Sequence, residues 1–158
     1  MGKLIIRFAK KTDLEGVNAI RRQVHMVHAK GRPDIFRRKF GRKLAYHIHE
    51  FFGGELSKVV VAKSGGSICG FASIEIIHKP RSPYNKARSY LRVTEFGVDQ
   101  EYRRQGIGKQ MLDFIKIYAA TKNFDTVELD VWEFNKGALK FYESQGFTTY
   151  RRFMEFKM

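Results

Sequence analysis

The chain has little of what would mark it as secreted or membrane-bound. Its single cysteine, Cys69, excludes an internal disulfide, as is usual for proteins of a reducing compartment. Long hydrophobic runs are also missing: the longest, such as residues 59–62, fall far short of the ~20 residues that cross a bilayer. The first residues lack the apolar region and cleavage site of a signal peptide. These absences predict a soluble, cytoplasmic protein with no membrane partner.

Acidic residues are scarce beside basic ones. Sixteen Asp and Glu stand against thirty Lys and Arg, so the net charge is +14. Residues 30–43 contain a large share of this excess, with seven Lys and Arg and one Asp. The excess favours an acidic partner, which could equally be nucleic acid, an acidic protein surface or a multiply phosphorylated cofactor. Charge by itself does not choose among them.

The chain does contain enough apolar material for one core. Hydrophobic residues make up 43% of it and aromatics 14%, so general disorder is excluded, and the length suits a single domain, residues 1–158. Periodicity and turn residues predict strands at 3–8, 58–63, 68–78, 89–99, 127–131 and 151–158, with room for one more near Phe147, and helices at 12–30, 34–52, 106–118 and 135–145. This order indicates one α/β domain with a mixed sheet.

Local signals set several of these boundaries. Thr12 and Glu15 form a capping box, which predicts the start of the first helix, and Asp34 is expected to cap the second. Residues 64–67, Ser-Gly-Gly-Ser, predict a hairpin between two β-branched runs. Asn135 is expected to cap the last helix.

Two glycines, Gly106 and Gly108, lie among cations where a predicted strand gives way to a predicted helix. Free backbone N–H groups at a helix N-terminus attract anions, and glycine lets a phosphate approach that backbone closely. The stretch has neither the Gly-Lys-Ser/Thr of a Walker A loop nor the third glycine of a Rossmann fingerprint. The arrangement of strand, Arg-x-x-Gly-x-Gly and helix therefore predicts a pyrophosphate site of another kind.

This segment, VDQEYRRQGIGKQML, and the later VELDVWEFNKGALKFYESQGF resemble the GNAT superfamily of acyl-CoA-dependent N-acetyltransferases. The resemblance implies a mixed, mostly antiparallel sheet of about 6–7 strands flanked by about 4 helices. It implies acetyl-CoA as co-substrate, no metal, and direct acetyl transfer to a primary amine of a small molecule or protein in a ternary complex. It is compatible with a monomer or a homodimer.

The resemblance also assigns candidate site residues. The turn that would bind the coenzyme A pyrophosphate comprises Arg103, Arg104, Gln105, Gly106, Ile107, Gly108 and Lys109. The backbone of Phe96, Gly97 and Val98 would pair with the pantetheine arm. Asn135 would contact the pantetheine as well as cap its helix. Tyr142 would lie near the thioester sulfur and protonate the leaving thiolate, whereas its residue pattern alone is that of a core aromatic.

Glu95 is the carboxylate best placed to take a proton from the amine or to bind the amine. It precedes Phe96 on the same predicted strand, and the simpler interpretation is an acid paired with a nearby arginine. Glu75, on the preceding strand, is the reserve candidate. His25 and His28 share a helix face, but two histidines without a third ligand make a poor metal site.

Two other functions fit the same sequence. The charge would suit a nucleic-acid or ribosome-associated binding module, although no aromatic-interleaved basic motif accompanies it. The fold would also suit a non-catalytic acyl-CoA sensor. Three results distinguish these functions. The enzyme binds coenzyme and turns it over, the sensor binds coenzyme without turnover, and the binding module shows salt-dependent binding to nucleic acid.

Overall fold

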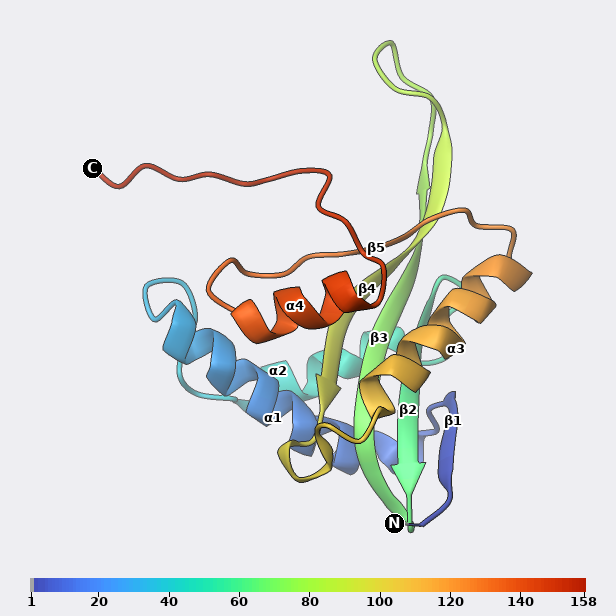
Figure 1. The fold of residues 1–158 in the computed structure, drawn as a ribbon, viewed down its shortest axis with the longest axis vertical. Coiled ribbons are helices and arrows are strands. Elements are labelled where there is room, and N and C mark those ends of the chain that lie inside the picture. Colours follow the sequence, from blue (N-terminus) through green and yellow to red (C-terminus); the bar gives the residue numbers. More distant parts are fainter. Residues whose placement is uncertain (1) are drawn as a thin grey trace.

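The computed structural model, which describes residues 2–158, is built on one five-stranded sheet (Figure 1). The strands are β1 (Leu4–Phe8), β2 (Ser57–Ser64), β3 (Ser67–Lys79), β4 (Arg88–Val98) and β5 (Val127–Leu129), and they lie in that order across the sheet. The pairs from β1 to β4 are antiparallel, and β4 and β5 are parallel. The expected mixed, mostly antiparallel sheet is confirmed, with five strands in the described chain instead of six or seven.

Four α-helices flank the sheet: α1 (Leu14–Gly31), α2 (Arg42–His47), α3 (Ile107–Thr121) and α4 (Lys136–Ser144). The alternation of β2 shows how both faces are covered. Val59 and Val61 face a cluster that includes Val17 and Ile20 of α1. Val60 and Ala62, on the opposite face of β2, belong to a second cluster built with α3. The buried stripe of α3 is Ile107, Met111, Ile115 and Ala119. No helix of residues 2–158 has the length and apolar character needed to cross a bilayer.

The predicted hairpin and the predicted third and fourth helices are confirmed. Gly65 and Gly66 have φ of 55° and 92°, the left-handed values that a two-residue hairpin turn requires. The α4 cap is also as predicted: Asn135 Oδ1 accepts a hydrogen bond from the Ala138 N–H at 3.1 Å. Both features depend on residues a few positions apart, which is why sequence patterns locate them.

The first helix begins by a different device from the predicted capping box. A 3₁₀ turn (Lys11–Asp13) precedes α1, and the Asp13 carboxylate accepts from the Lys10 N–H at 2.7 Å. The same carboxylate pairs with Arg7 of β1, also at 2.7 Å. An ion pair to a neighbouring strand therefore takes the place of the expected cap by Thr12.

The predicted helix from Asp34 to Phe52 is wrong over its first half. Residues 34–41 are irregular, and only α2 and the 3₁₀ turn Ile48–Phe51 are helical. Asp34 pairs with Arg32 at 2.7 Å instead of capping a helix. A helix through this basic segment would have stacked like charges four residues apart, such as Arg38 on Arg42, which is unfavourable.

The predicted strand at 151–158 and the further strand near Phe147 are absent. The Phe147 N–H caps α4 by donating to Tyr142 O at 3.0 Å, and residues 148–158 run as an exposed extended arm. Within residues 2–158 the arm pairs with no strand, so it forms no backbone ladder.

Candidate active site

The two parallel strands of the sheet separate part of the way along, and this separation forms the site. β5 pairs with β4 only from Leu91 to Val93, whereas β3 stays paired with β4 as far as Val98. Residues 94–98 therefore have a strand on one side and none on the other. Apart from Val98 O, which accepts from Arg103 Nε, the backbone groups of residues 96–98 that point away from β3 are free to bind an extended amide-containing chain.

The glycine turn leads from this open edge into α3. Arg104 and Gly106 both have left-handed backbones, with φ of 65° and 76°. The Gln110 N–H donates to Gly106 O at 3.1 Å, which is the first helical bond of α3. The N–H groups of Ile107, Gly108 and Lys109 thus have no partner within the helix, and the first turn holds no acidic residue. This terminus is suited to an anion.

The two glycines of the turn have different roles. A Cβ on Gly106 would meet nothing within 4 Å, so Gly106 opens onto free space. A Cβ on Gly108 would lie 2.9 Å from Cζ of Phe141, a side chain of α4. Gly108 is therefore needed for the close packing of α4 on α3, a tertiary reason that the sequence did not reveal, whereas Gly106 leaves room for a ligand.

The cations of the turn are only partly directed towards this terminus. Arg103 Nε donates to Val98 O at 3.2 Å, which ties the turn to the end of β4. Lys109 pairs with Asp113 one turn along α3 at 2.6 Å. Gln105 Nε2 contacts Glu101 O at 3.4 Å. Arg104 is exposed and makes no ion pair within the described chain, so its charge is available to a ligand.

Helix α4 brings Tyr142 beside the open edge of β4. The Tyr142 ring lies 6.0 Å from the Phe96 ring and 5.8 Å from the Phe147 ring, both edge-on. Burial raises the pKa of the Tyr142 phenol to about 12. Within residues 2–158 the Tyr142 hydroxyl makes no hydrogen bond, and its oxygen is accessible to solvent. Asn135 begins the same helix, so both lie on one element.

Glu95 is held by a buried arginine. Arg21 of α1 donates from Nε and Nη2 to the two carboxylate oxygens, at 2.8 and 3.0 Å. Arg21 is only 2% exposed, while Glu95 is 26% exposed. Arg21 Nη1 also donates to Leu44 O at 2.8 Å. The pair therefore joins α1, β4 and the start of α2, and Glu95 keeps one side open to solvent.

Sequence reasoning expected a nearby arginine for Glu95 but did not single out Arg21. The two residues lie 74 positions apart, so no local pattern connects them. The only signal was an arginine next to Ile20 on the apolar side of an amphipathic helix. The reserve carboxylate, Glu75, stands on β3 opposite Arg92 and forms no ion pair in the described part of the chain.

We expect Glu95→Gln to lower the free energy of unfolding by about 1–2 kcal/mol, because the buried Arg21 loses its charged partner but keeps a neutral acceptor at position 95 and the oxygens of Asn18 and Leu44. Chemical denaturation measures this. Glu75→Gln is the matched control, since it removes a half-buried carboxylate that forms no ion pair within residues 2–158, and it should leave stability nearly unchanged. If Glu95 also accepts the amine proton, kcat of folded Glu95→Gln falls; an unchanged kcat would restrict Glu95 to holding Arg21.

Aromatic side chains gather beside the site, at the C-terminal end of α1. His28 stacks on Phe36 at 5.3 Å, and Trp132 meets Phe36 edge-on at 5.4 Å. Burial, followed by the neighbouring His25, lowers the pKa of His28. His25 Nε2 lies 2.6 Å from Arg37 O. Both histidines therefore anchor the irregular 34–41 segment on α1, as ordinary helix residues would.

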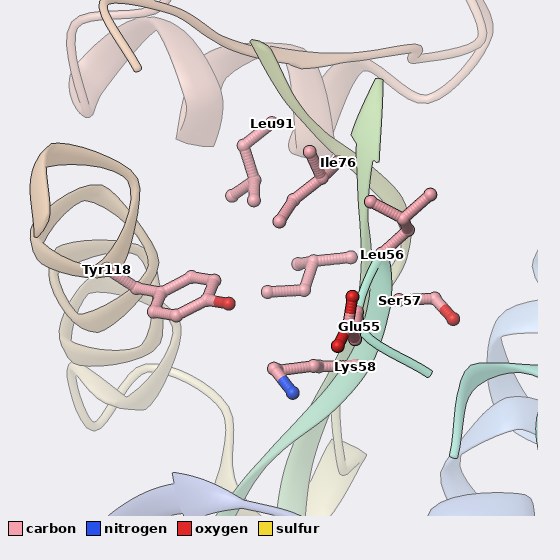
Figure 2. Close-up of a pocket in the computed structure, with 8 residues that line it drawn as sticks. Glu55, Leu56, Ser57, Lys58, Ile76, Leu91 and Tyr118 are labelled. Atoms are coloured by element: carbon pink, nitrogen blue, oxygen red, sulfur yellow. The ribbon is translucent and has the colours of Figure 1, made fainter. Parts of the chain in front are cut away.

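Two hollows of the surface lie elsewhere. One, between β2, β3, β4 and α3, is lined by Leu56, Ile76, Leu91 and the ring of Tyr118 (Figure 2). It has no room for a water molecule, so it is too tight for a ligand. The other lies by the start of α1 and the β2–β3 hairpin. Neither hollow includes Gly106 or Tyr142.

Comparison with known proteins connects this geometry to a family. The acetyltransferase (GNAT) family matches residues 28–147. Among solved structures, a tetramutant of the BH1408 protein from Bacillus halodurans superposes with a TM-score of 0.93, at 31% identity over 98% of this chain and 99% of that one. Curated protein sequences give no significant match.

Two aminoglycoside acetyltransferases share the fold at lower identity. AAC(6')-Iy, in complex with the bisubstrate analogue CoA-S-monomethyl-acetylneamine, has a TM-score of 0.78 and 18% identity over 99% of each chain. The enzyme meta-AAC0020, from an uncultured soil sample and in complex with sisomicin, has a TM-score of 0.72 and 20% identity over 98% of this chain and 95% of that one. At such identities these structures establish a common fold only.

Proposed function

Since the chain belongs to the acetyltransferase (GNAT) family, we propose that it transfers an acetyl group from acetyl-CoA to a primary amine, by direct attack in a ternary complex. The observation that carries the proposal is the separation of β4 from β5, with free helix N–H groups at one end and Tyr142 beside it. The open edge of β4 and its neighbours thus offer an anion site, an amide-pairing edge and a proton donor in sequence.

The open edge of β4, the start of α3 and the helix α4 each suit a part of the co-substrate. The N–H groups of residues 107–109 and the charge of Arg104 would hold the pyrophosphate. The backbone of residues 96–98 would pair with the amides of the pantetheine arm, and Asn135 would contact the same arm. This binding would place the thioester near Tyr142, because α4 packs against Phe96.

The reaction needs two proton transfers. The amine nitrogen forms a bond to the acetyl carbon, the carbon–sulfur bond breaks, and the sulfur leaves with the bonding electrons. A carboxylate such as Glu95, or a water beside it, takes the proton that the amine loses. Tyr142 gives its phenolic proton to the thiolate. A pKa of about 12 keeps Tyr142 protonated at neutral pH, so the donor is present before each turnover.

The exposed cations of the segment that follows α1 favour an acceptor that is not a polycation. Five exposed cations follow α1 and form no ion pair within residues 2–158, namely Arg37, Arg38, Lys39, Arg42 and Lys43. The β3–β4 hairpin carries Lys79, Arg81 and Lys86 at the opposite end of β4 from residues 94–98 (Figure 1). The positive field of the cations after α1 would repel a polycation, and it would attract an amine that carries carboxylate or phosphate groups, or an acidic protein segment.

An activity screen tests the function and its acceptor class together. Acetyl-CoA is mixed with neutral, acidic and polycationic amines, and thiol release is followed. We expect turnover, with kcat/KM at low salt highest for acidic amines and lowest for aminoglycosides and polyamines, and a smaller difference at high salt. Coenzyme binding without any turnover would contradict catalysis. Absent coenzyme binding together with salt-dependent nucleic-acid binding would contradict the whole proposal.

A further inference from the structure

The hairpin that joins β3 to β4 projects beyond the rest of the molecule (Figure 1). Residues 78–89 are all exposed, and the side chain of Tyr84 near the tip is 95% exposed. Between Glu75 and Glu95 the sequence has five Lys and Arg and no acid, although the whole chain has sixteen acids. The hairpin therefore presents positive charge and one aromatic ring to solvent.

Three of these cations are free to meet a partner. Lys79, Arg81 and Lys86 form no ion pair within residues 2–158. Arg88 differs, because it pairs with Glu128 and lies over the Tyr90 ring at 4.2 Å. The charge of Arg88 is therefore neutralised by its own chain, whereas the charges of the other three are not.

The tip of the hairpin is held in one shape by its own hydrogen bonds. The Ser82 N–H donates to Asn85 O at 3.0 Å, and Ser82 Oγ accepts from the N–H groups of Tyr84 and Asn85 at 3.3 and 3.0 Å. Pro80 and Pro83 restrict the backbone further. None of these bonds uses the Tyr84 ring. A ring that a preformed turn holds in solvent loses little freedom when a partner binds.

Cations beside an exposed ring are the features with which proteins hold single-stranded nucleic acid. The cations contact the phosphates, and an unpaired base stacks on the ring. In a duplex the faces of the bases are already stacked on one another. A lipid surface would require apolar side chains that insert, and residues 79–88 contain no Leu, Ile, Val, Met or Phe. The chemistry of the hairpin thus favours a single strand.

The hairpin lies far from the proposed coenzyme site. It ends where β4 begins, at Arg88, whereas the glycine turn follows the other end of β4, at Val98. A strand of 11 residues separates the two ends by roughly 30 Å. A strand of nucleic acid on the hairpin would therefore leave the start of α3 open.

We propose that the β3–β4 hairpin docks single-stranded nucleic acid. Lys79, Arg81 and Lys86 contact phosphates of the strand, and Tyr84 stacks on one of its bases. The contact is a second binding surface of the chain, separate from the open edge of β4. It depends neither on coenzyme binding nor on acetyl transfer.

Fluorescence anisotropy of the full chain with labelled oligo-U RNA and oligo-dT DNA of about 12 nucleotides tests the stacking contact. Binding to either strand supports the proposal, and the tighter of the two identifies the kind of strand. Tyr84→Ala should weaken binding about 10-fold, because one stacked base is lost. Tyr46→Ala is the matched control: Tyr46 is 67% exposed on α2, away from the hairpin, and its variant should bind as the wild type does.

The salt dependence of the same binding tests the phosphate contacts. Changing the three free cations of the hairpin to Ser together should reduce the slope of log affinity against log salt by about 2, because three phosphate contacts are lost. The matched control changes Arg37, Arg38 and Lys39 to Ser. These three residues are also exposed, and the variant has the same net charge, but the slope should stay near the wild-type value. An equal loss in both triple variants would overturn the proposal by assigning the binding to diffuse charge.

Two further readouts can overturn the proposal. Inorganic polyphosphate has phosphates but no bases, so its binding should not change with Tyr84→Ala; an equal loss for polyphosphate and oligonucleotide would exclude stacking. Saturating coenzyme A should not displace the oligonucleotide, and displacement would place the strand at the glycine turn instead. The substituted side chains are exposed, so each variant should keep its thermal unfolding midpoint. None of these readouts measures acetyl transfer, so their failure would leave the proposed function untouched.

Discussion

Tyr142→Phe is expected to lower turnover about 10²-fold while coenzyme affinity and fold are retained. A phenol beside the sulfur can protonate the departing thiolate, whereas a phenyl ring of nearly the same shape cannot, and loss of a positioned general acid costs at least this factor. The ring contacts with Phe96 and Phe147 do not involve the hydroxyl, so packing persists. Steady-state kinetics gives kcat, and calorimetric titration with coenzyme A gives the affinity.

Tyr118→Phe is the matched control. Tyr118 is also a partly buried phenol whose pKa is raised by burial, but it lies on α3 and lines the small hollow of Figure 2. Its variant should keep full turnover. Tyr142→Phe should lower turnover less when the acyl donor has a more acidic leaving group, since that group needs less help to depart. Full turnover by Tyr142→Phe with the natural acceptor would assign the proton to another source.

The pH dependence should agree. Burial raises the pKa of Tyr142 to about 12, so its neutral, proton-donating form is complete at neutral pH and declines only as pH approaches 12. Tyr142 should therefore contribute no loss of kcat between pH 7 and 10. A wild-type alkaline limb below pH 10 that disappears in Tyr142→Phe would contradict the raised pKa.

Gly106→Val is expected to weaken coenzyme A binding about 30-fold or more, which is about 2 kcal/mol. The new side chain would enter the open space at the start of α3, where the pyrophosphate is proposed to bind. It would also strain a backbone with φ of 76°, at a cost of about 1–2 kcal/mol in stability. Calorimetric titration measures the affinity, and chemical denaturation measures the stability.

Gly53→Val separates these two effects. Gly53 has φ of 78° and open space around its Cβ, but it lies before β2, outside the turn. The Gly53→Val variant should lose about as much stability as Gly106→Val but keep the wild-type affinity for coenzyme A. Gly108→Val is a poorer probe than its sequence context suggests, because its side chain would collide with Phe141 and disturb α4. Unchanged affinity in a folded Gly106→Val would contradict the pyrophosphate site.

The sequence predicted most where neighbouring residues decide the structure. The hairpin at Gly65 and Gly66, the cap at Asn135 and the buried stripe of α3 all depend on positions within one or two turns of each other. The same holds for the glycine turn: strand, cations, glycines and helix are consecutive. Its placement at a helix N-terminus is confirmed, and its role in binding coenzyme stays a prediction.

The sequence misled where a distant partner decides. Residues 34–41 carry helical signals, but Phe36 stacks on His28 of α1 and also contacts Trp132, which lies nearly 100 residues further along the chain. The arm has a correct strand pattern, yet a strand needs a neighbour, and the described chain supplies none. A local sequence pattern indicates which structure a segment can form, but it does not show whether the segment has a neighbour to pair or pack with.

From its own residues, the chain determined its family, its mixed sheet and the position of the glycine turn before α3, because short-range periodicity and a contiguous motif carry that information. Only the tertiary structure decided that Glu95 is held by the buried Arg21, that Gly108 serves the packing of Phe141 while Gly106 remains open, and that β5 keeps a free edge. Each of these depends on which elements meet in space, and residues 74 positions apart are brought together by packing, not by any local rule.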